Sequence, residues 1–349
     1  MNSIDFFFVF FLECLKMNSR EIQEFYNDIK DSYSKFIETH ISWVIIRKND
    51  VIKIKKPIKN SFLDFSTLDK RNYFCQKEVY LNSRITEGIY RGVVSICWKD
   101  KWVIHKGNDK PEEYGVWMKR LNEDYFLPAV LNNHRLSQIH IVNLANKIFQ
   151  FHSKAEVFFQ LKSDSISSRF SDIKSIEDQL MKNSLSYLFQ KINLILLYNE
   201  RVRDQLELLL EDRLNKGKIR DVHGDLHSGN IFIYPEPVLF DCIEYNDDFR
   251  IIDMLDDLAF LCMDLDKYGY ESFSTLLLIH YLNLSKEVLD DDIHFLFLYY
   301  KMYRANVRAK VIALKEKLNQ KDKEDIIAYV DLMEKYKVQM ICSFPETRV

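Results

Sequence analysis

One short stretch of the sequence, HGDLHSGN at residues 223–230, combines residue types that suit phosphoryl transfer. Within it, Asp225 and Asn230 stand five residues apart, the spacing of loops that pair a proton-accepting carboxylate with a metal-binding amide. The carboxylate would accept the proton of an attacking hydroxyl and orient its oxygen. The amide oxygen would coordinate Mg²⁺ without competing for that proton. We therefore predict Asp225 as the catalytic base and Asn230 as a metal ligand.

A second acid, Asp241, follows a short predicted hairpin. Residues 231–234 and 238–240 read as strands joined by a Pro-Glu-Pro turn, and Asp241 comes directly after the second strand. The hairpin would return Asp241 to the start of the loop, beside Asp225 and Asn230. So few hard oxygen ligands suit a Mg²⁺ ion that retains water and triphosphate oxygens. Three nearby acids are assigned instead to a solvated surface: Asp247, Asp248 and Asp266.

The elements that must position these residues predict an α+β fold with two lobes. Helices are expected at 18–38 and 67–85, and strands on both sides of the turn Lys48-Asn49-Asp50, within 92–107 and within 113–121. From residue 125 the pattern is almost wholly helical, apart from a loop and hairpin near 221–245. We predict a small antiparallel β-rich lobe at 18–120 and a larger helical lobe at 121–349 that holds the loop and the substrate helices.

The residue patterns of three predicted elements place further charged residues. In the strand that follows the turn, apolar residues alternate with Lys53 and Lys55, so both lysines project from one face. Glu78 lies on the apolar flank of the helix predicted at 67–85. The segment 251–264 is apolar nearly all round, so a carboxylate such as Asp257 must be paired there, which predicts a structural anchor.

Composition excludes several classes of protein. The chain has 349 residues, 47% hydrophobic and 29% charged, and a net charge of −3, which argues against disorder and against a basic nucleic-acid surface. Six cysteines without a CxxC pair favour free thiols and a cytoplasmic location. The apolar run Ile4–Leu15 is shorter than the ~20 residues of a membrane span, so no membrane association is expected. We interpret residues 1–17 as an extension, which would be non-native if Met17 is the true start. The alternative is a hydrophobic arm that docks on the body of the protein.

The motifs together resemble a known family. HGDLHSGN, a following strand that ends in Asp241, and the later Asp-Leu-Ala at 257–259 are similar to aminoglycoside phosphotransferase-like kinases, which have the protein-kinase fold. Further segments resemble an uncharacterised bacterial branch that is often fused to a P-loop ATPase domain: THISWV, KIKKP, FLDFSTL, LFDCIEYN and DLAFL. The resemblance runs from about residue 39 to at least 264. It implies ATP and Mg²⁺ as cofactors and a hydroxyl-bearing small molecule as substrate.

The resemblance also implies roles for matching residues. Lys53 would meet the α- and β-phosphates with Glu78 as its partner, although Lys55 competes for this role because it shares the same face. His223 would shape the catalytic loop and Asp257 would hold that loop from the helix beneath. The resemblance likewise implies that Asp225 is the catalytic base and that Asn230 and Asp241 are the Mg²⁺ ligands. Backbone near Met118, within 117–121, would bind adenine.

Departures from the family pattern keep a second hypothesis open. The turn expected to hold phosphate, His40-Ile41-Ser42, has no glycine, although the Ser42 hydroxyl and backbone N–H groups could still bind phosphate. The acid at 241 is followed by Cys-Ile-Glu in place of a glycine-containing turn, which leaves Glu244 as a metal or substrate group or as a local replacement for that turn. A non-catalytic nucleotide-binding module is therefore the alternative to a small-molecule kinase.

Two further alternatives carry less support in the sequence. No GxxxxGK[ST] motif occurs, so any P-loop ATPase partner would be separate. His223 and His227 are spaced like metal ligands, but no third ligand follows and zinc is disfavoured.

Overall fold

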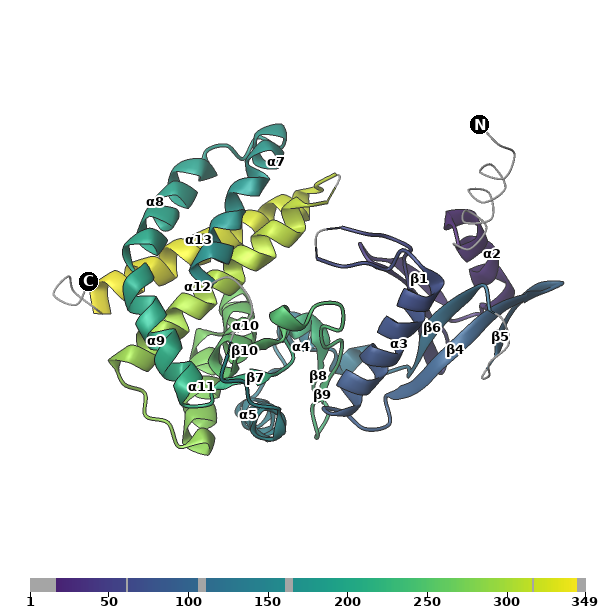
Figure 1. The fold of residues 1–349 in the computed structure, drawn as a ribbon, viewed down its shortest axis with the longest axis horizontal. Coiled ribbons are helices and arrows are strands. Elements are labelled where there is room, and N and C mark those ends of the chain that lie inside the picture. Colours follow the sequence, from purple (N-terminus) through teal and green to yellow (C-terminus); the bar gives the residue numbers. More distant parts are fainter. Residues whose placement is uncertain (1–16, 61, 106–110, 161–165, 316, 344–349) are drawn as a thin grey trace. The chain divides into compact units, whose positions relative to one another are not determined.

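The computed structural model describes residues 17–60, 62–105, 111–160, 166–315 and 317–343 (Figure 1). The chain divides into two compact units, the first formed by Met1–Glu123 with Val238–Asp247 and the second by Asp124–Pro237 with Asp248–Val349. The segment 238–247, which the sequence assigned to the helical lobe, therefore belongs with the β-rich unit. Residues 1–16 of the predicted extension lie outside the described residues, whereas Met17 is buried in the first unit.

A six-stranded antiparallel sheet forms the centre of the first unit, with strand order β1-β2-β3-β6-β4-β5. Helix α3 packs against β4 and β6, and α2 packs against β5. The short strand β9 belongs to the same unit. The elements are α2 (Ser19–Ile29), β1 (Lys35–Glu38), β2 (Ser42–Ile46), β3 (Asp50–Lys55), α3 (Leu68–Ser83), β4 (Tyr90–Lys99), β5 (Lys101–His105), β6 (Glu113–Lys119) and β9 (Val238–Leu239).

Successive side chains of β3 point to opposite faces of the sheet, so apolar and charged residues lie on different faces. Ile52 and Ile54 are fully buried in a cluster with residues of α2, including Phe25. Lys53 and Lys55 point to the opposite face, where α3 lies. One strand thus supplies core to one side and two cations to the other, as the sequence predicts.

The helix predicted at 18–38 is correct only in its first part, because α2 ends at Ile29. After it, the carboxylate of Asp31 accepts hydrogen bonds from the Tyr33 N–H and the Ser34 hydroxyl, 2.9 and 3.1 Å long. Such local side-chain bonds compete with the helical ladder. The chain therefore turns and continues as β1, a strand that the sequence analysis did not predict.

The second unit is mostly helical, and α12 and α13 run side by side within it (Figure 1). Strands β7 and β10 pair antiparallel. The 3₁₀ segments are Glu123–Tyr125, Ser171–Ile176, Ser228–Asn230 and Asp247–Phe249. Its other elements are α4 (Leu127–Asn132), α5 (Gln138–Lys154), α6 (Ile166–Phe170), α7 (Glu177–Lys182), α8 (Leu188–Arg201), α9 (Arg203–Asn215), β7 (Ile219–Asp221), β8 (Ile231–Phe232), β10 (Ile251–Asp253), α10 (Met254–Lys267), α11 (Glu271–Ser285), α12 (Asp291–Ala313) and α13 (Gln320–Ser343). The α+β class, with an antiparallel β-rich part followed by a mostly helical part, is confirmed.

Helix α10 is buried on all sides from Met254 to Asp266. It begins at Met254 rather than at the predicted residue 251, because Asp253 caps it by accepting the Leu255 N–H at 2.8 Å. The predicted solvated position of Asp266 is wrong. Its carboxylate is buried, pairs with Lys301 and accepts the hydroxyl of Tyr336 at 2.7 Å.

The five cysteines among the described residues are free, and Cys14 lies outside those residues. No helix in the described part of the chain combines the length and apolar character needed to cross a bilayer.

Candidate active site

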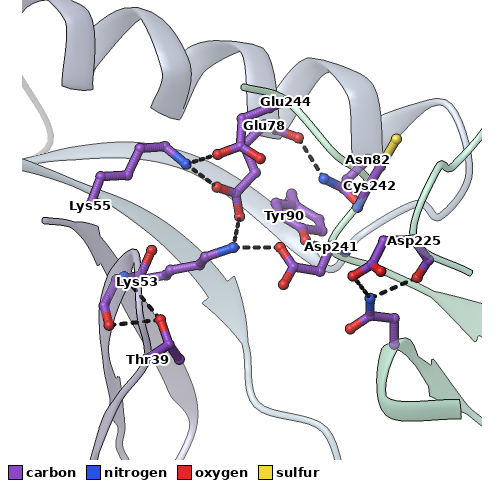
Figure 2. A network of polar contacts seen from close by, with 12 residues as sticks. Thr39, Lys53, Lys55, Glu78, Asn82, Tyr90, Asp225, Asp241, Cys242 and Glu244 are labelled. Carbon is purple, nitrogen blue, oxygen red and sulfur yellow. Dashed lines mark hydrogen bonds and ion pairs between the residues drawn. The ribbon is translucent and has the colours of Figure 1, made fainter. Parts of the chain in front are cut away.

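A cluster of five charged side chains lies on the α3 side of the sheet in the first unit (Figure 2). Lys53 Nζ lies 3.0 Å from Glu78 Oε1 and contacts Asp241. Lys55 Nζ lies 2.7 Å from Glu78 Oε2 and contacts Glu244. Each oxygen of Glu78 therefore holds a different lysine, and both lysines reach the segment 238–247.

Solvent exposure separates the two lysines. The side chains of Lys53 and Asp241 are 11% and 38% exposed, whereas those of Lys55 and Glu78 are fully buried and that of Glu244 is 3% exposed. A phosphate group can reach a lysine only if solvent can. The geometry therefore favours Lys53 over Lys55 as the phosphate-contacting residue.

Mutual charge pairing shifts the pKa values of the cluster. Burial alone would lower the pKa of Lys53, but Asp241 and Glu78 outweigh it and raise the pKa well above its usual value. Burial would raise the pKa of Glu78, and the two lysines lower it instead. For Glu244, burial and the neighbouring Glu78 outweigh Lys55, so its pKa is raised and it takes up a proton before Glu78 on acidification.

Asp241 is held in an unusual backbone conformation. Its φ is +64°, in the left-handed region, which costs a residue with a side chain about 1–2 kcal/mol. Its N–H donates to the hydroxyl of Tyr90 at 3.0 Å, and the N–H of Cys242 donates to Asn82 Oδ1 at 2.9 Å (Figure 2). Tyr90 and Asn82 were not predicted as site residues, because neither type carries a recognisable signal at its position.

Two predicted nucleotide contacts, Ser42 and Met118, lie on the strands that flank β3 and are not members of the charged cluster. Ser42 lies directly opposite Lys55. The turn between β1 and β2 spans residues 39–41, and Ser42 is the buried first residue of β2. The Ser42 N–H donates to Thr39 Oγ1 at 2.9 Å, whereas its hydroxyl has no hydrogen-bond partner among the described residues. Met118 lies near the end of β6, opposite Val51 and Tyr90. The backbone N–H groups of Lys119 and Arg120, which follow it, already donate to Ile89 and Asn49.

The second unit contains the predicted catalytic loop. The amide nitrogen of Asn230 donates to the backbone oxygen of Asp225 at 2.9 Å and to its carboxylate Oδ2 at 3.0 Å. The amide is thereby oriented, and Asn230 Oδ1 is left for another partner. His227 is a site residue that the sequence analysis set aside with zinc. Its Nε2 lies 3.4 Å from Asp225 Oδ2, while its Nδ1 accepts the Gly229 N–H at 3.0 Å.

The environment of Asp225 keeps its carboxylate ionised. Burial raises the pKa of Asp225, but the nearby His227, Arg308 and His223 outweigh it and hold the pKa below its usual value. The side chain remains 36% exposed, so a substrate hydroxyl can reach it. An ionised, accessible carboxylate is what a general base requires.

Asp257 lies beneath this loop on α10. Its Oδ2 accepts the His223 N–H at 3.1 Å and its Oδ1 accepts the Gly224 N–H at 2.8 Å. His152 Nε2 lies 3.0 Å from Oδ2, and His152 Nδ1 lies 2.8 Å from the hydroxyl of Tyr281. The side chains of Asp257 and His152 are fully buried. This is the arrangement that an anchor requires, and His152 is part of it.

The residues present fit Mg²⁺ by their chemistry. Asp241 offers a partly exposed carboxylate and Asn230 an amide oxygen, which are hard ligands that Mg²⁺ accepts alongside water and phosphate. In the first unit, two lysines face three carboxylates, a formal charge of 2 − 3 = −1 that suits a cation. Within the described residues, no group of three or more His, Cys, Asp or Glu could hold a metal alone. The predicted meeting of Asp241 with Asp225 and Asn230 joins residues of both units and stays a prediction.

Comparisons with known proteins were made at the levels of sequence and structure. No family model matches the chain. Uncharacterized proteins of Mycobacterium tuberculosis and Mycobacterium bovis are 27% identical over 283 residues, which cover 78% of this chain and 53% of theirs. The chain thus spans about half the length of the curated relatives it matches.

Solved structures similar to this chain include proteins named as kinases and as phosphotransferases. An ethanolamine kinase of Plasmodium vivax is 10% identical, with a TM-score of 0.48 and coverage of 89% of this chain and 84% of its own. A choline/ethanolamine kinase family protein from Mesorhizobium loti is 10% identical, with a TM-score of 0.46 and coverage of 92% and 90%. An aminoglycoside phosphotransferase solved with streptomycin and ATP is 14% identical, with a TM-score of 0.43 and coverage of 90% and 98%.

Proposed function

We propose that this chain is an ATP- and Mg²⁺-dependent phosphotransferase that transfers the γ-phosphoryl group to a hydroxyl of a small molecule. The observation that carries the proposal is the cluster in which Lys53 pairs with Glu78 and Asp241. It combines a partly accessible cation for phosphate with a partly accessible carboxylate for metal. The loop in which Asn230 bonds to Asp225 supplies the second part of the chemistry.

Each residue has a defined role in the proposed reaction. Lys53 binds the α- and β-phosphates, with Glu78 holding its ammonium group in place. Asn230 and Asp241 would be the Mg²⁺ ligands, and the bound ion would neutralise charge on the phosphate oxygens. Asp225 accepts the proton of the acceptor hydroxyl as that oxygen bonds to the γ-phosphorus. The bond from this phosphorus to the bridging oxygen breaks, and ADP leaves.

A small-molecule acceptor is favoured by the short run that follows Asp241. Only residues 242–250 separate it from β10, and α10 begins at Met254. A protein substrate is usually held by a longer, open activation segment, for which this run leaves no room. We propose no nucleic-acid substrate and a cytosolic location, since the chain is weakly acidic and its described cysteines are free. A separate P-loop ATPase partner is suggested by the family resemblance alone.

A non-catalytic nucleotide-binding module is the second candidate. It is favoured by the turn at residues 39–41, which lacks glycine and whose neighbouring Ser42 N–H is already bonded to Thr39. Fewer free N–H groups leave less to bind a phosphate. The two candidates differ in whether Asp225 matters for turnover.

Thermal shift with Mg-ATP tests nucleotide binding directly. We expect ligand at about 100 times its Kd to stabilise the chain by about 2.7 kcal/mol. Asp241→Asn should abolish most of this stabilisation, because it removes a proposed metal ligand, whereas Asp225→Asn should retain it. No shift of Tm in millimolar Mg-ATP would contradict the proposal.

The two lysines of β3 should respond differently to replacement. Lys53→Met should weaken Mg-ATP affinity about tenfold or more, since it removes the charged group proposed to contact phosphate. Lys55→Met should mainly lower the free energy of unfolding, by about 3–5 kcal/mol, because it leaves Glu244 buried without its cation. Calorimetric titration and denaturant unfolding measure the two effects. The reverse pattern would assign the phosphate to Lys55.

A further inference from the structure

We infer that the buried ion pair between Lys55 and Glu244 is a clamp that positions Asp241 for metal binding. The inference rests on the proposed function, because it gives the clamp a purpose within that site. It assigns a role to Glu244, which the sequence left open between a ligand and a replacement for a turn. The clamp acts through Asp241, so both of its residues are positioning residues.

The clamp joins the same two segments that meet at the accessible pair Lys53–Asp241. Lys55 follows Lys53 by two residues on β3, and Glu244 follows Asp241 by three. Lys55 is fully buried and Glu244 is 3% exposed, so neither can serve as a direct ligand for a metal or phosphate in solvent. A buried contact between the same segments fixes their spacing without competing for the ligand.

Asp241 needs such a restraint because of its backbone. Its left-handed φ of +64° lies in a region that glycine adopts freely and that aspartate adopts only occasionally. The Asp241 N–H donates to the Tyr90 hydroxyl and the Cys242 N–H donates to Asn82 Oδ1, so the peptide groups on both sides of the Asp241 α-carbon are held. Glu244, three residues after Asp241, anchors the segment that follows to Lys55 of β3.

The clamp also keeps Glu78 paired when Lys53 engages a phosphate. Lys55 Nζ lies 2.7 Å from Glu78 Oε2, and Lys53 binds the other oxygen. A buried carboxylate that lost its only cation would be strongly destabilised. With Lys55 in place, Lys53 can turn its ammonium group toward nucleotide while Glu78 remains charge-paired.

The first readout needs no ligand. Hydrogen exchange of the amides of Asp241 and Cys242 reports how firmly the segment is held. We expect Glu244→Gln and Glu244→Asp to speed exchange at both amides about tenfold or more. The matched control is Lys77→Ala, which removes a more exposed ion pair, 2.7 Å long, from α3 to Asp247 in the same segment. It should leave both amides within about threefold of the parent.

The second readout is nucleotide binding with and without metal. Residues that support a metal ligand typically contribute 10–100-fold to metal affinity. We expect Glu244→Gln to weaken ATP binding in Mg²⁺ by about tenfold or more, and to change binding in EDTA by less than about threefold. Lys77→Ala should match the parent in both conditions.

The outcomes separate the clamp from the proposed function. Parent-like exchange and parent-like Mg-ATP affinity in both Glu244 variants would overturn the clamp and leave the phosphotransferase proposal intact. A parent protein that binds no Mg-ATP would overturn the proposed function, while exchange would still decide whether Glu244 restrains Asp241. If neither single variant folds, Lys55→Met/Glu244→Leu replaces the pair with apolar side chains and leaves no charge of the pair unmatched. Faster exchange in this variant supports the clamp, and unchanged exchange overturns it.

Discussion

Asp225→Asn is expected to lower kcat by a factor of about 10²–10⁴ with ATP and an accepting hydroxyl compound. The carboxylate is proposed to take the hydroxyl proton, and an amide of the same shape cannot. The pKa of Asp225 lies below its usual value because His227, Arg308 and His223 outweigh burial, so the parent residue is ionised throughout the neutral range. The acid limb of a pH–rate profile near neutrality should therefore not come from Asp225.

The experiment profiles metabolite extracts with Mg-ATP and compares the parent with Asp225→Asn, which also identifies the acceptor. The substitution should leave the Mg-ATP thermal shift within a few degrees of the parent, because Asp225 is proposed to contact the acceptor rather than the nucleotide. Asp248→Asn, an acid outside the proposed machinery, serves as the control and should retain activity. Equal turnover by the parent and Asp225→Asn would remove Asp225 from the mechanism and favour a different base.

Asp257→Ala is expected to lower the free energy of unfolding by about 3–5 kcal/mol. The substitution leaves the N–H groups of His223 and Gly224 and the ring of His152 without their shared acceptor. All of these lie in the interior of the second unit, where an unsatisfied polar group costs most. Denaturant unfolding followed by circular dichroism measures the change.

The pH dependence of this loss has a defined sign. Burial raises the pKa of Asp257, but His152 and other neighbours outweigh it and the net pKa is lowered. The carboxylate therefore contributes stability above its ordinary pKa of 3.8, and this contribution is lost as pH falls through the lowered value. The difference between parent and variant should be constant near pH 7 and shrink in strong acid. Asp331→Ala, which removes an exposed ion pair with Lys191, should change stability by less than about 1 kcal/mol. Equal unfolding energies for parent and Asp257→Ala would contradict the anchor.

Local sequence patterns predicted the elements that carry the site. Period-two alternation placed Lys53 and Lys55 on one face of β3, and helical spacing placed Glu78 on a buried flank of α3. The five-residue spacing of Asp225 and Asn230 corresponds to a direct hydrogen bond within the loop. These features depend on residues near one another in the chain, so the pattern of side chains and turns is sufficient to predict them.

Two predictions were wrong, the first because of a local competitor and the second because of a distant partner. Helix α2 ends early because the side chains of Asp31 and Ser34 form a turn, which adds strand β1. Asp266 resembles a surface acid by composition, but Lys301 on another helix pairs with it in the interior. The sequence shows that a residue is charged, but it does not show whether the fold will bury that residue beside a partner from a distant segment.

The residue types and local elements of the candidate site could be predicted from the sequence alone: a loop with Asp225 and Asn230 five residues apart, a strand with two lysines, and a helix with a glutamate on its apolar flank. Which charges pair depends on contacts between distant segments of the chain. Lys55 pairs with Glu244, which is 189 positions away in the chain. Asp257 contacts His152, which is 105 positions away. Such pairs depend on how the elements pack. A buried charge or polar group without a partner costs free energy, so it pairs with a group that the fold places beside it. Packing likewise leaves the side chain of Lys53 11% exposed and buries that of Lys55 completely, which is why Lys53 is the one proposed to contact a nucleotide.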